Sequence, residues 1–520
     1  MDVLARRAGR RLEVTLGGRS RTRVIVLLAC VLALSSADTA TVGASATQLR
    51  AALGISNTDV GLLVTVSSLT AAAASIPFGA LADRVRRTRT LGIAIATWGV
   101  AMIWSASSPS FGRLLLARLG LGVVTAAAGP IVASLIGDYF PGAERGRIYG
   151  YVLSGELAGA GAGFAVTGDI AALSWQAAFV ILALPAFVLA WYVLHMPEPR
   201  RGGTDPLPID GAPPPAASPG VPPSGGPAAG GGSRHTGSDQ DGPPEPRPHE
   251  TDAQRVARMR GVLPDYDVLN GPDPGSLGIF RAIRYVLGIR TNMILILASS
   301  FGYFYLAGIQ TFGVEFVKKQ YGIDQAAANL LLLMLGAGAV CGVLVGGRLG
   351  DRLLARHHLT GRITVTVVAA TATTLLFVPA LASHSMVSAL PYLVFAAFAL
   401  AAQNPAIDAA RLDIVPSYLW GRAEGVRTAA RTVAQAVAPL LFGVFSDHVF
   451  GGGRHGLQWT FVVMLVPLGA NAVYLWKAMR TYPRDVATAA ALHQASMSGR
   501  HRRPRGTEPV TRPVRPPELP

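Results

Sequence analysis

Three ionisable residues of this sequence stand inside long apolar runs, where a charge is costly: Asp38, Arg118 and Glu156. Ionisable groups in such runs mostly pair with one another or carry ions and protons. At 1.5 Å per residue, Asp38 lies about 21 Å and Arg118 about 22 Å from the same face of an apolar layer of about 30 Å. The equal depth makes an Asp38–Arg118 pair geometrically possible, and such a pair would be either a proton-coupling site or a permanent salt bridge. Glu156 is the other candidate for proton coupling.

No enzyme motif accompanies these residues. The adjacent His357 and His358 lack the spacing of a metal site, and the sequence has no phosphate-binding loop of the form G-x-x-x-x-G-K-[ST]. We therefore expect no catalysis, no cofactor and no metal. An isolated carboxylate suits protons better than sodium, which prefers several oxygen ligands, so a proton gradient is the expected source of energy.

The composition predicts the elements that hold these residues. Of 520 residues, 50% are hydrophobic and 15% are charged, and the mean hydropathy is +0.39; a soluble protein carries about 25% charged residues. Because lipid satisfies no backbone hydrogen bonds, apolar runs of about 20 residues predict membrane-spanning helices. The sequence contains twelve such runs in two sets of six, near 24–47, 56–80, 90–108, 113–137, 148–170 and 176–196, then near 291–315, 326–347, 361–382, 387–410, 426–446 and 457–479.

The placement of the arginines decides what the formal charge of +16 means. They gather before the first run and after every second one, for example at Arg84, Arg147, Arg348 and Arg422, while the alternate loops carry few cations. This positive-inside pattern predicts a multi-pass protein of the plasma membrane with both termini in the cytoplasm. It explains the basic charge without a nucleic-acid partner, and we expect none.

Two similar stretches divide the chain into halves. "DYFPGAERGRIYG" at 138–150 and "DIVPSYLWGRAEG" at 413–425 share D-x-x-P-x-x-x-x-G-R-x-x-G, with an offset of 275 from Asp138 to Asp413. Such parallel repeats are known from secondary transporters. Pro- and Gly-rich sequence between the halves predicts a disordered linker, in which 275–288 is either an interfacial helix or an extension of the next span. The expected units are a basic cytoplasmic N-terminus (1–23), an N-terminal bundle (24–196), the cytoplasmic linker (197–290), a C-terminal bundle (291–480) and a disordered basic cytoplasmic tail (481–520).

"GALADRVRRTR" at 79–89 resembles the loop motif of the major facilitator superfamily, and "GRLGDR" at 347–352 resembles its second copy. Within that superfamily the first half is similar to the spinster-like branch, through "ADTATVGAS", "RLGLGVVTAAAGPIVASLIGD" and "GAGAGF". The resemblance implies an all-α membrane protein with twelve transmembrane helices in two homologous six-helix bundles. Thr39 stands where those proteins often carry arginine, and Thr125 where many carry glutamate.

The resemblance also implies a cytoplasmic gate. In the family, the aspartate that ends span two faces the start of span eleven, where a carboxylate can meet unpaired N–H groups and the positive end of a helix dipole. Asp83 should therefore hold the cytoplasmic side shut, and Asp351 should do the same at the start of span five. In the alternative interpretation, the arginines of the motif only enforce topology. The gate candidates are Gly79, Asp83, Arg84, Arg87, Gly347, Asp351, Arg352, Arg147 and Arg422.

The expected function is secondary active transport of an amphipathic or lipid-like small molecule, by a monomer that is surrounded by membrane lipids and coupled to protons. The alternatives are a polyspecific drug exporter, against which Ala160 stands where the exporter motif has proline, and a non-transporting membrane sensor or scaffold. Several polar residues in the spans are either substrate contacts or ordinary interhelical contacts. These cavity candidates are Thr39, Thr125, Tyr303, Tyr305, Gln310, Gln403 and Asn404.

Overall fold

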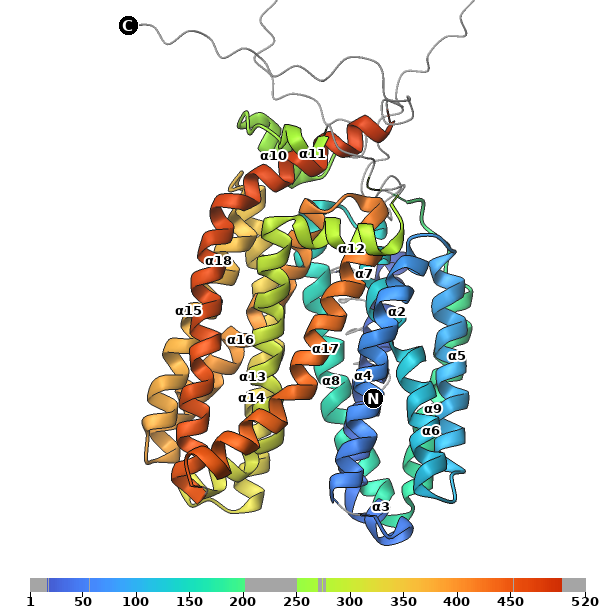
Figure 1. Ribbon diagram of the computed structural model, residues 1–520, viewed down its shortest axis with the longest axis vertical. Coiled ribbons are helices and arrows are strands. Elements are labelled where there is room, and N and C mark those ends of the chain that lie inside the picture. Colours follow the sequence, from blue (N-terminus) through green and yellow to red (C-terminus); the bar gives the residue numbers. More distant parts are fainter. Residues whose placement is uncertain are drawn as a thin grey trace, which may run out of the picture.

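The structure, a computed structural model, describes residues 16, 18–55, 57–201, 250–269, 274, 277–451 and 453–497. Within these ranges the regular elements are helices, arranged as two bundles side by side (Figure 1). Nine candidate spans are long and apolar enough to cross a membrane. Three further long helices, α5 (Arg87–Ala106), α8 (Arg145–Leu173) and α17 (Trp420–Val444), begin with charged turns and complete the twelve expected spans.

The N-terminal bundle holds the first six spans. Its fourth span is divided at Ala126 and Ala127, because Pro130 lacks an amide hydrogen and crowds the carbonyl four residues before it. The first and fifth spans pack closely because glycines leave room between them: a Cβ on Gly159 would lie 2.2 Å from the Ala33 carbonyl oxygen. The elements are α2 (Arg19–Ala44), the short α3 (Ala46–Leu53), α4 (Asn57–Ala82), α5, α6 (Phe111–Thr125), α7 (Ala128–Tyr139), η1 (Gly142–Glu144), α8 and α9 (Trp175–Leu194).

The C-terminal bundle repeats this plan. The short helix η3 (Ser417–Leu419) follows Pro416 before α17, just as η1 follows Pro141 before α8, so the sequence repeat is also a repeat of local structure. Large apolar side chains remain exposed on the outer faces of both bundles, for example Trp191 and Leu440, as a lipid-facing surface requires. The remaining elements are α13 (Arg290–Tyr321), α14 (Gln325–Ala355), α15 (Gly361–Ala382), α16 (Met386–Ile414), η4 (Phe445–Val449) and α18 (Gly453–Met497).

Short helices cover the end of the C-terminal bundle that lies next to the linker, and the first two lie where the sequence predicted disorder. α10 (Asp252–Met259) begins with a capping box formed by Thr251 and Gln254, and α11 (Tyr266–Leu269) and α12 (Ile279–Gly288) follow it. α12 coincides with the helix expected near 275–288. Linker residues 202–249 lie outside the described residues, as do residues 1–15 of the N-terminus and 498–520 of the tail.

The prediction of a disordered tail from residue 481 is wrong as far as Met497, because α18 continues to that residue. The apolar side chains of Tyr482, Val486 and Leu492 recur at helical spacing and are buried. They belong to the part of α18 that runs beside α10 and α11 (Figure 1). Burial of this stripe accounts for a helix that extends beyond the membrane.

Candidate functional site

Asp83, which directly follows α4, meets the start of α17 in the other half. One carboxylate oxygen accepts a hydrogen bond from the Gly421 N–H at 2.7 Å and the other from the Arg422 N–H at 3.0 Å, and Arg422 Nε lies 3.5 Å away. The close approach of α4 and α17 requires glycine at position 79, since a Cβ on Gly79 would lie 2.4 Å from the Gly421 carbonyl oxygen. A carboxylate thus caps the positive end of a helix, as the loop motif implied.

Asp351, in the last turns of α14, makes the equivalent contact with the start of α8. It accepts hydrogen bonds from the N–H groups of Gly146 at 3.1 Å and Arg147 at 2.7 Å. A Cβ on Gly347 would lie 2.0 Å from the Gly146 carbonyl oxygen. Arg362 of α15 also donates to Asp351, at 2.7 Å. We call the Asp83 and Asp351 contacts the N-latch and the C-latch.

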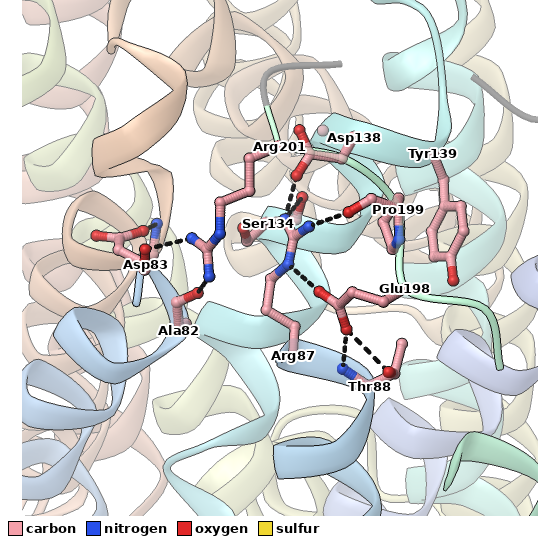
Figure 2. Close-up of polar contacts among 12 residues, drawn as sticks. Ala82, Asp83, Arg87, Thr88, Ser134, Asp138, Tyr139, Glu198, Pro199 and Arg201 are labelled. Atoms are coloured by element: carbon pink, nitrogen blue, oxygen red, sulfur yellow. Dashed lines mark hydrogen bonds and ion pairs between the residues drawn. The ribbon is translucent and has the colours of Figure 1, made fainter. Parts of the chain in front are cut away.

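The remaining arginines of the motif lie elsewhere. Arg84 and Arg352 are exposed, and the Arg147 side chain pairs with Glu144 at 2.8 Å. The expectation that Arg87 belongs to the gate between the halves is wrong, because its buried guanidinium points into its own bundle. There it pairs with Asp138 and donates to Ser134 Oγ at 2.9 Å (Figure 2).

Residues 197–201, here called the strap, join α9 to the linker and bind this arginine. Glu198 accepts hydrogen bonds from Arg87 Nε at 2.9 Å and from the Thr88 N–H and hydroxyl at 2.9 and 2.8 Å. Burial opposes the charged form of Glu198, but the hydrogen bonds from Thr88 and Arg87 outweigh it and lower the pKa of the carboxyl. The strap is therefore fastened to the start of α5.

Arg201 fastens the strap to the N-latch as well. Its guanidinium donates to the carbonyls of Ala82 at 3.0 Å and Val85 at 2.7 Å, and also to the carbonyl of Asp83 (Figure 2). These carbonyls lie where α4 ends and have no partner in the helix itself, so a cation satisfies them well. The strap was not singled out in the sequence, because its residues lie outside the motif and approach it only in the fold.

Asp38 and Arg118 form a buried pair in the N-terminal bundle. Arg118 Nη1 donates to Asp38 Oδ1 at 2.8 Å, and the two side chains are 2% and 8% exposed, respectively. The guanidinium also lies 4.6 Å from the centroid of the Phe179 ring. Arg118 Nε and Nη2 are buried and have no hydrogen-bond partner within the described ranges. The two residues for which the residue counts gave equal depths are therefore in contact.

The C-terminal bundle holds a cluster of four buried charges that the sequence interpretation missed. Arg427 lies 3.0 Å from Asp408 and 2.6 Å from Glu424, and Arg411 lies 2.5 Å from the other oxygen of Glu424. Ser299 of α13 accepts a further hydrogen bond from Arg427 at 3.0 Å. The available signal was an acid followed three residues later by a base, at Asp408 and Arg411 and again at Glu424 and Arg427.

The cavity candidates are distributed over several environments. Tyr303 is buried beneath Arg431, whose guanidinium lies 4.5 Å from the ring centroid, and Glu156 is half-buried. Tyr305 is not a cavity residue, because its ring is fully buried among Phe377, Phe442 and Phe461 inside the C-terminal bundle.

The other cavity candidates are polar residues on four helices. The Thr125 hydroxyl donates to the Leu121 carbonyl at 2.5 Å, and the buried Gln403 donates to the Leu400 carbonyl at 3.1 Å. Asn404 is half-buried, and Thr39 and Gln310 are exposed. Within the part of the chain that the structure describes, no three His, Cys, Asp or Glu side chains are grouped to hold a metal ion.

Comparisons with known proteins give one family. The model of the Major Facilitator Superfamily matches residues 28–390 and 293–515. The probable L-galactonate transporter of Escherichia coli (strain K12) is 29% identical over 184 residues, which cover 34% of this chain and 40% of that protein. Protein spinster of Drosophila melanogaster is 24% identical over 190 residues, which cover 36% of this chain and 31% of that protein. The matches thus span two fifths or less of these relatives.

A solved structure agrees with this result at the level of the fold. The proton:xylose symporter XylE bound to 6-bromo-6-deoxy-D-glucose superposes with a TM-score of 0.62 at 15% sequence identity. The superposition covers 88% of this chain and 95% of that one.

Proposed function

This chain belongs to the major facilitator superfamily, and we propose that it is a proton-coupled secondary transporter that moves an amphipathic or lipid-like molecule by alternating access. Membership makes it a multi-pass membrane transporter and sets it apart from enzymes. The lipid-like substrate class is the one that the spinster-like motifs of the first half imply, and the similarity to protein spinster agrees with that branch. We further propose a monomer in the plasma membrane with both termini in the cytoplasm, on the positive-inside pattern of its arginines.

Alternating access is supported by where the two halves touch. Besides the two latches, the Ser75 hydroxyl of α4 donates to the Gly425 carbonyl of α17 at 3.0 Å, and a Cβ on Gly150 would lie 2.7 Å from the Val343 carbonyl oxygen. These contacts lie toward the end of the bundles that we propose faces the cytoplasm, whereas the bundles stand apart near α3 (Figure 1). In the proposed cycle this is the state closed to the cytoplasm, and it opens when the latches break.

The single observation that carries proton coupling is the buried Asp38–Arg118 pair. In the proposed coupling, the carboxyl of Asp38 loads a proton in one state of the transporter and releases it in the other, because water access to the pair differs between the two states. Glu156 is the second candidate for this role.

The test uses Asp38→Asn, Arg118→Gln and the double variant in liposomes with an imposed pH gradient. If Asp38 couples transport, Asp38→Asn loses gradient-driven uptake of a labelled lysolipid but keeps its melting temperature. If the pair is only structural, Asp38→Asn strands Arg118 at a cost of roughly 3 to 5 kcal/mol, and the double variant recovers stability. Full gradient-driven uptake by Asp38→Asn would exclude the coupling role and transfer it to Glu156.

Flux measurements in the same liposomes distinguish the proposed function from its alternatives. A polyspecific drug exporter would move hydrophobic cations as readily as lysolipids, whereas a sensor or scaffold would move neither. Two latches at symmetric positions favour transport, because a scaffold has no need of a gate that opens and closes.

A further inference from the structure

Arg431 lies next to the charge cluster of the C-terminal bundle but forms no ion pair with it. Within it, the two guanidinium groups of Arg411 and Arg427 are balanced by the carboxylates of Asp408 and Glu424. Arg431 follows Arg427 by one helical turn on α17 and takes no part in these ion pairs. No carboxylate of the described residues lies within 4.0 Å of it, so Glu156 and Glu424 act on it electrostatically without forming an ion pair. Its buried Nε has no hydrogen-bond partner.

The contacts and the burial of Arg431 favour the binding of a ligand. Its guanidinium lies over the Tyr303 ring of α13, 4.5 Å from the centroid, which fixes the plane of the fork. The residue is half-buried, at the point where α17 changes from a buried segment, 420–428, to one with exposed positions. A guanidinium away from bulk water is costly without a negative partner, and its planar fork matches the oxygens of a carboxylate, sulfonate or phosphate.

Arg431 lies near the middle of α17, 11 residues and about 17 Å along the helix from its first residue, Trp420. Substrate sites of such transporters lie near the midplane, between the two repeats. The offset of 275 that relates Asp138 to Asp413 relates Arg431 to Glu156, which lies 11 residues after Arg145, the first residue of α8. The two repeats thus contribute one cation and one acid at the same depth.

We propose that the transported molecule carries an anionic group, which Arg431 binds and Tyr303 orients. This inference rests on the proposed transport function and narrows its substrate to an amphipathic anion. Glu156 does not bind the anion; its carboxylate disfavours a second negative charge and so limits the size and charge of the head group. A cationic substrate would reverse these roles, with Glu156 as its partner and Arg431 as an obstacle.

The test measures binding to the purified full chain in phosphatidylcholine nanodiscs. Three fluorescent single-chain amphiphiles of equal acyl length differ only in the head group: lysophosphatidate, lysophosphatidylcholine and an alkyltrimethylammonium ion. We expect Arg431→Gln to weaken lysophosphatidate binding roughly tenfold or more, the loss of about one charge-assisted pair. Arg431→Lys keeps the charge but not the fork and should lose less. Glu156→Gln should bind the anion at least as tightly as the unaltered chain. Arg113→Gln, which removes an exposed arginine at the start of α6, is the matched control.

Three outcomes would overturn the inference: equal lysophosphatidate affinity in Arg431→Gln and the unaltered chain, preference for the cation, or equal losses in Arg431→Gln and Glu156→Gln. Melting temperatures of all variants identify a general folding defect. If Arg431→Gln has such a defect, the result for Arg431→Lys tests the inference, because a weaker anion affinity in a stable Lys variant still supports the site. Flux is measured separately in liposomes. Anion binding without flux contradicts transport but keeps the site, whereas flux of neutral or cationic probes alone contradicts the site but keeps transport.

Discussion

The N-latch and the C-latch are copies of one motif with different supports. In the C-terminal half, the buried Arg362 binds Asp351 at 2.7 Å and also pairs with Asp413 and donates to the Gly142 carbonyl of the other half. Arg87 stands at the equivalent position of the repeat, 275 residues earlier, and pairs with Asp138 just as Arg362 pairs with Asp413. It does not reach the N-latch, because it binds Glu198 of the strap instead.

The difference shows that two copies of one motif can be supported by different parts of the chain. The C-latch is held by a side chain inside the membrane bundle. The N-latch is held from outside, since Arg201 of the strap binds the carbonyls at the end of α4 and the chain continues from there into the linker.

The largest expected effect is a difference in stability between the variants of Arg362 and Arg87. Arg362→Gln leaves Asp351 and Asp413 buried without their cation and should cost roughly 3 to 5 kcal/mol of stability. Arg87→Gln should cost less, because one of its partners, Glu198, is 27% exposed and can turn to water. Melting temperatures in detergent check the order, with the exposed Arg113→Gln as the control. A larger loss for Arg87→Gln would contradict the comparison.

The next effect concerns opening on the cytoplasmic side. Asp83→Ala and Asp351→Ala each remove the acceptor of two N–H groups, worth roughly 1.5 to 3 kcal/mol per charge-assisted bond before solvent replaces it. A cysteine at the fully buried Ser75, in a chain with Cys30 and Cys341 replaced by serine, reports access from the cytoplasm. Both variants should speed labelling, and Asp351→Ala should also lower the melting temperature. Unchanged labelling in both would exclude the latches as a gate.

A smaller effect should follow from the strap. Arg201→Ala removes hydrogen bonds to the end of α4 but leaves Asp83 in place, so labelling at Ser75→Cys should rise less than in Asp83→Ala. The neighbouring Arg200 is exposed and Arg200→Ala is the matched control. Equal labelling in the Arg201 and Arg200 variants would show that the strap does not support the N-latch.

The smallest effect is a dependence on acidic pH. The pKa of Glu198 is lower in the folded chain than its ordinary value of 4.5, so its contacts contribute stability above pH 4.5 and lose it as the pH falls through the lowered pKa. Limited proteolysis of the strap should therefore accelerate at the acidic end of the stable range, and Glu198→Gln should remove this dependence. In the described part of the C-terminal half, the equivalent Arg362 forms its ion pairs with Asp351 and Asp413, and this half should show no matching change.

Much of this architecture is determined by the sequence alone, because hydropathy and helical rise are local quantities. They give the twelve spans, and the matching stretches at 138–150 and 413–425 give the two halves. The equal depth of Asp38 and Arg118 followed from residue counts, and the two latch aspartates followed from a resemblance in short motifs. Each of these features depends on residues close together in the chain, or on counting along one helix.

Only the tertiary structure decides which partner a buried charge receives. Arg87 and Arg362 occupy equivalent positions of the repeat, yet one turns to the strap and the other to its latch, because only the first bundle is followed by Glu198 and Arg201. The extension of α18 to Met497 likewise depends on α10 and α11, which cover its apolar stripe. Arg431 has no ion pair in this cluster, because the two acids on α16 and α17 pair with Arg411 and Arg427 instead. The partner of a buried side chain depends on residues from several helices, so no single segment of the sequence determines it.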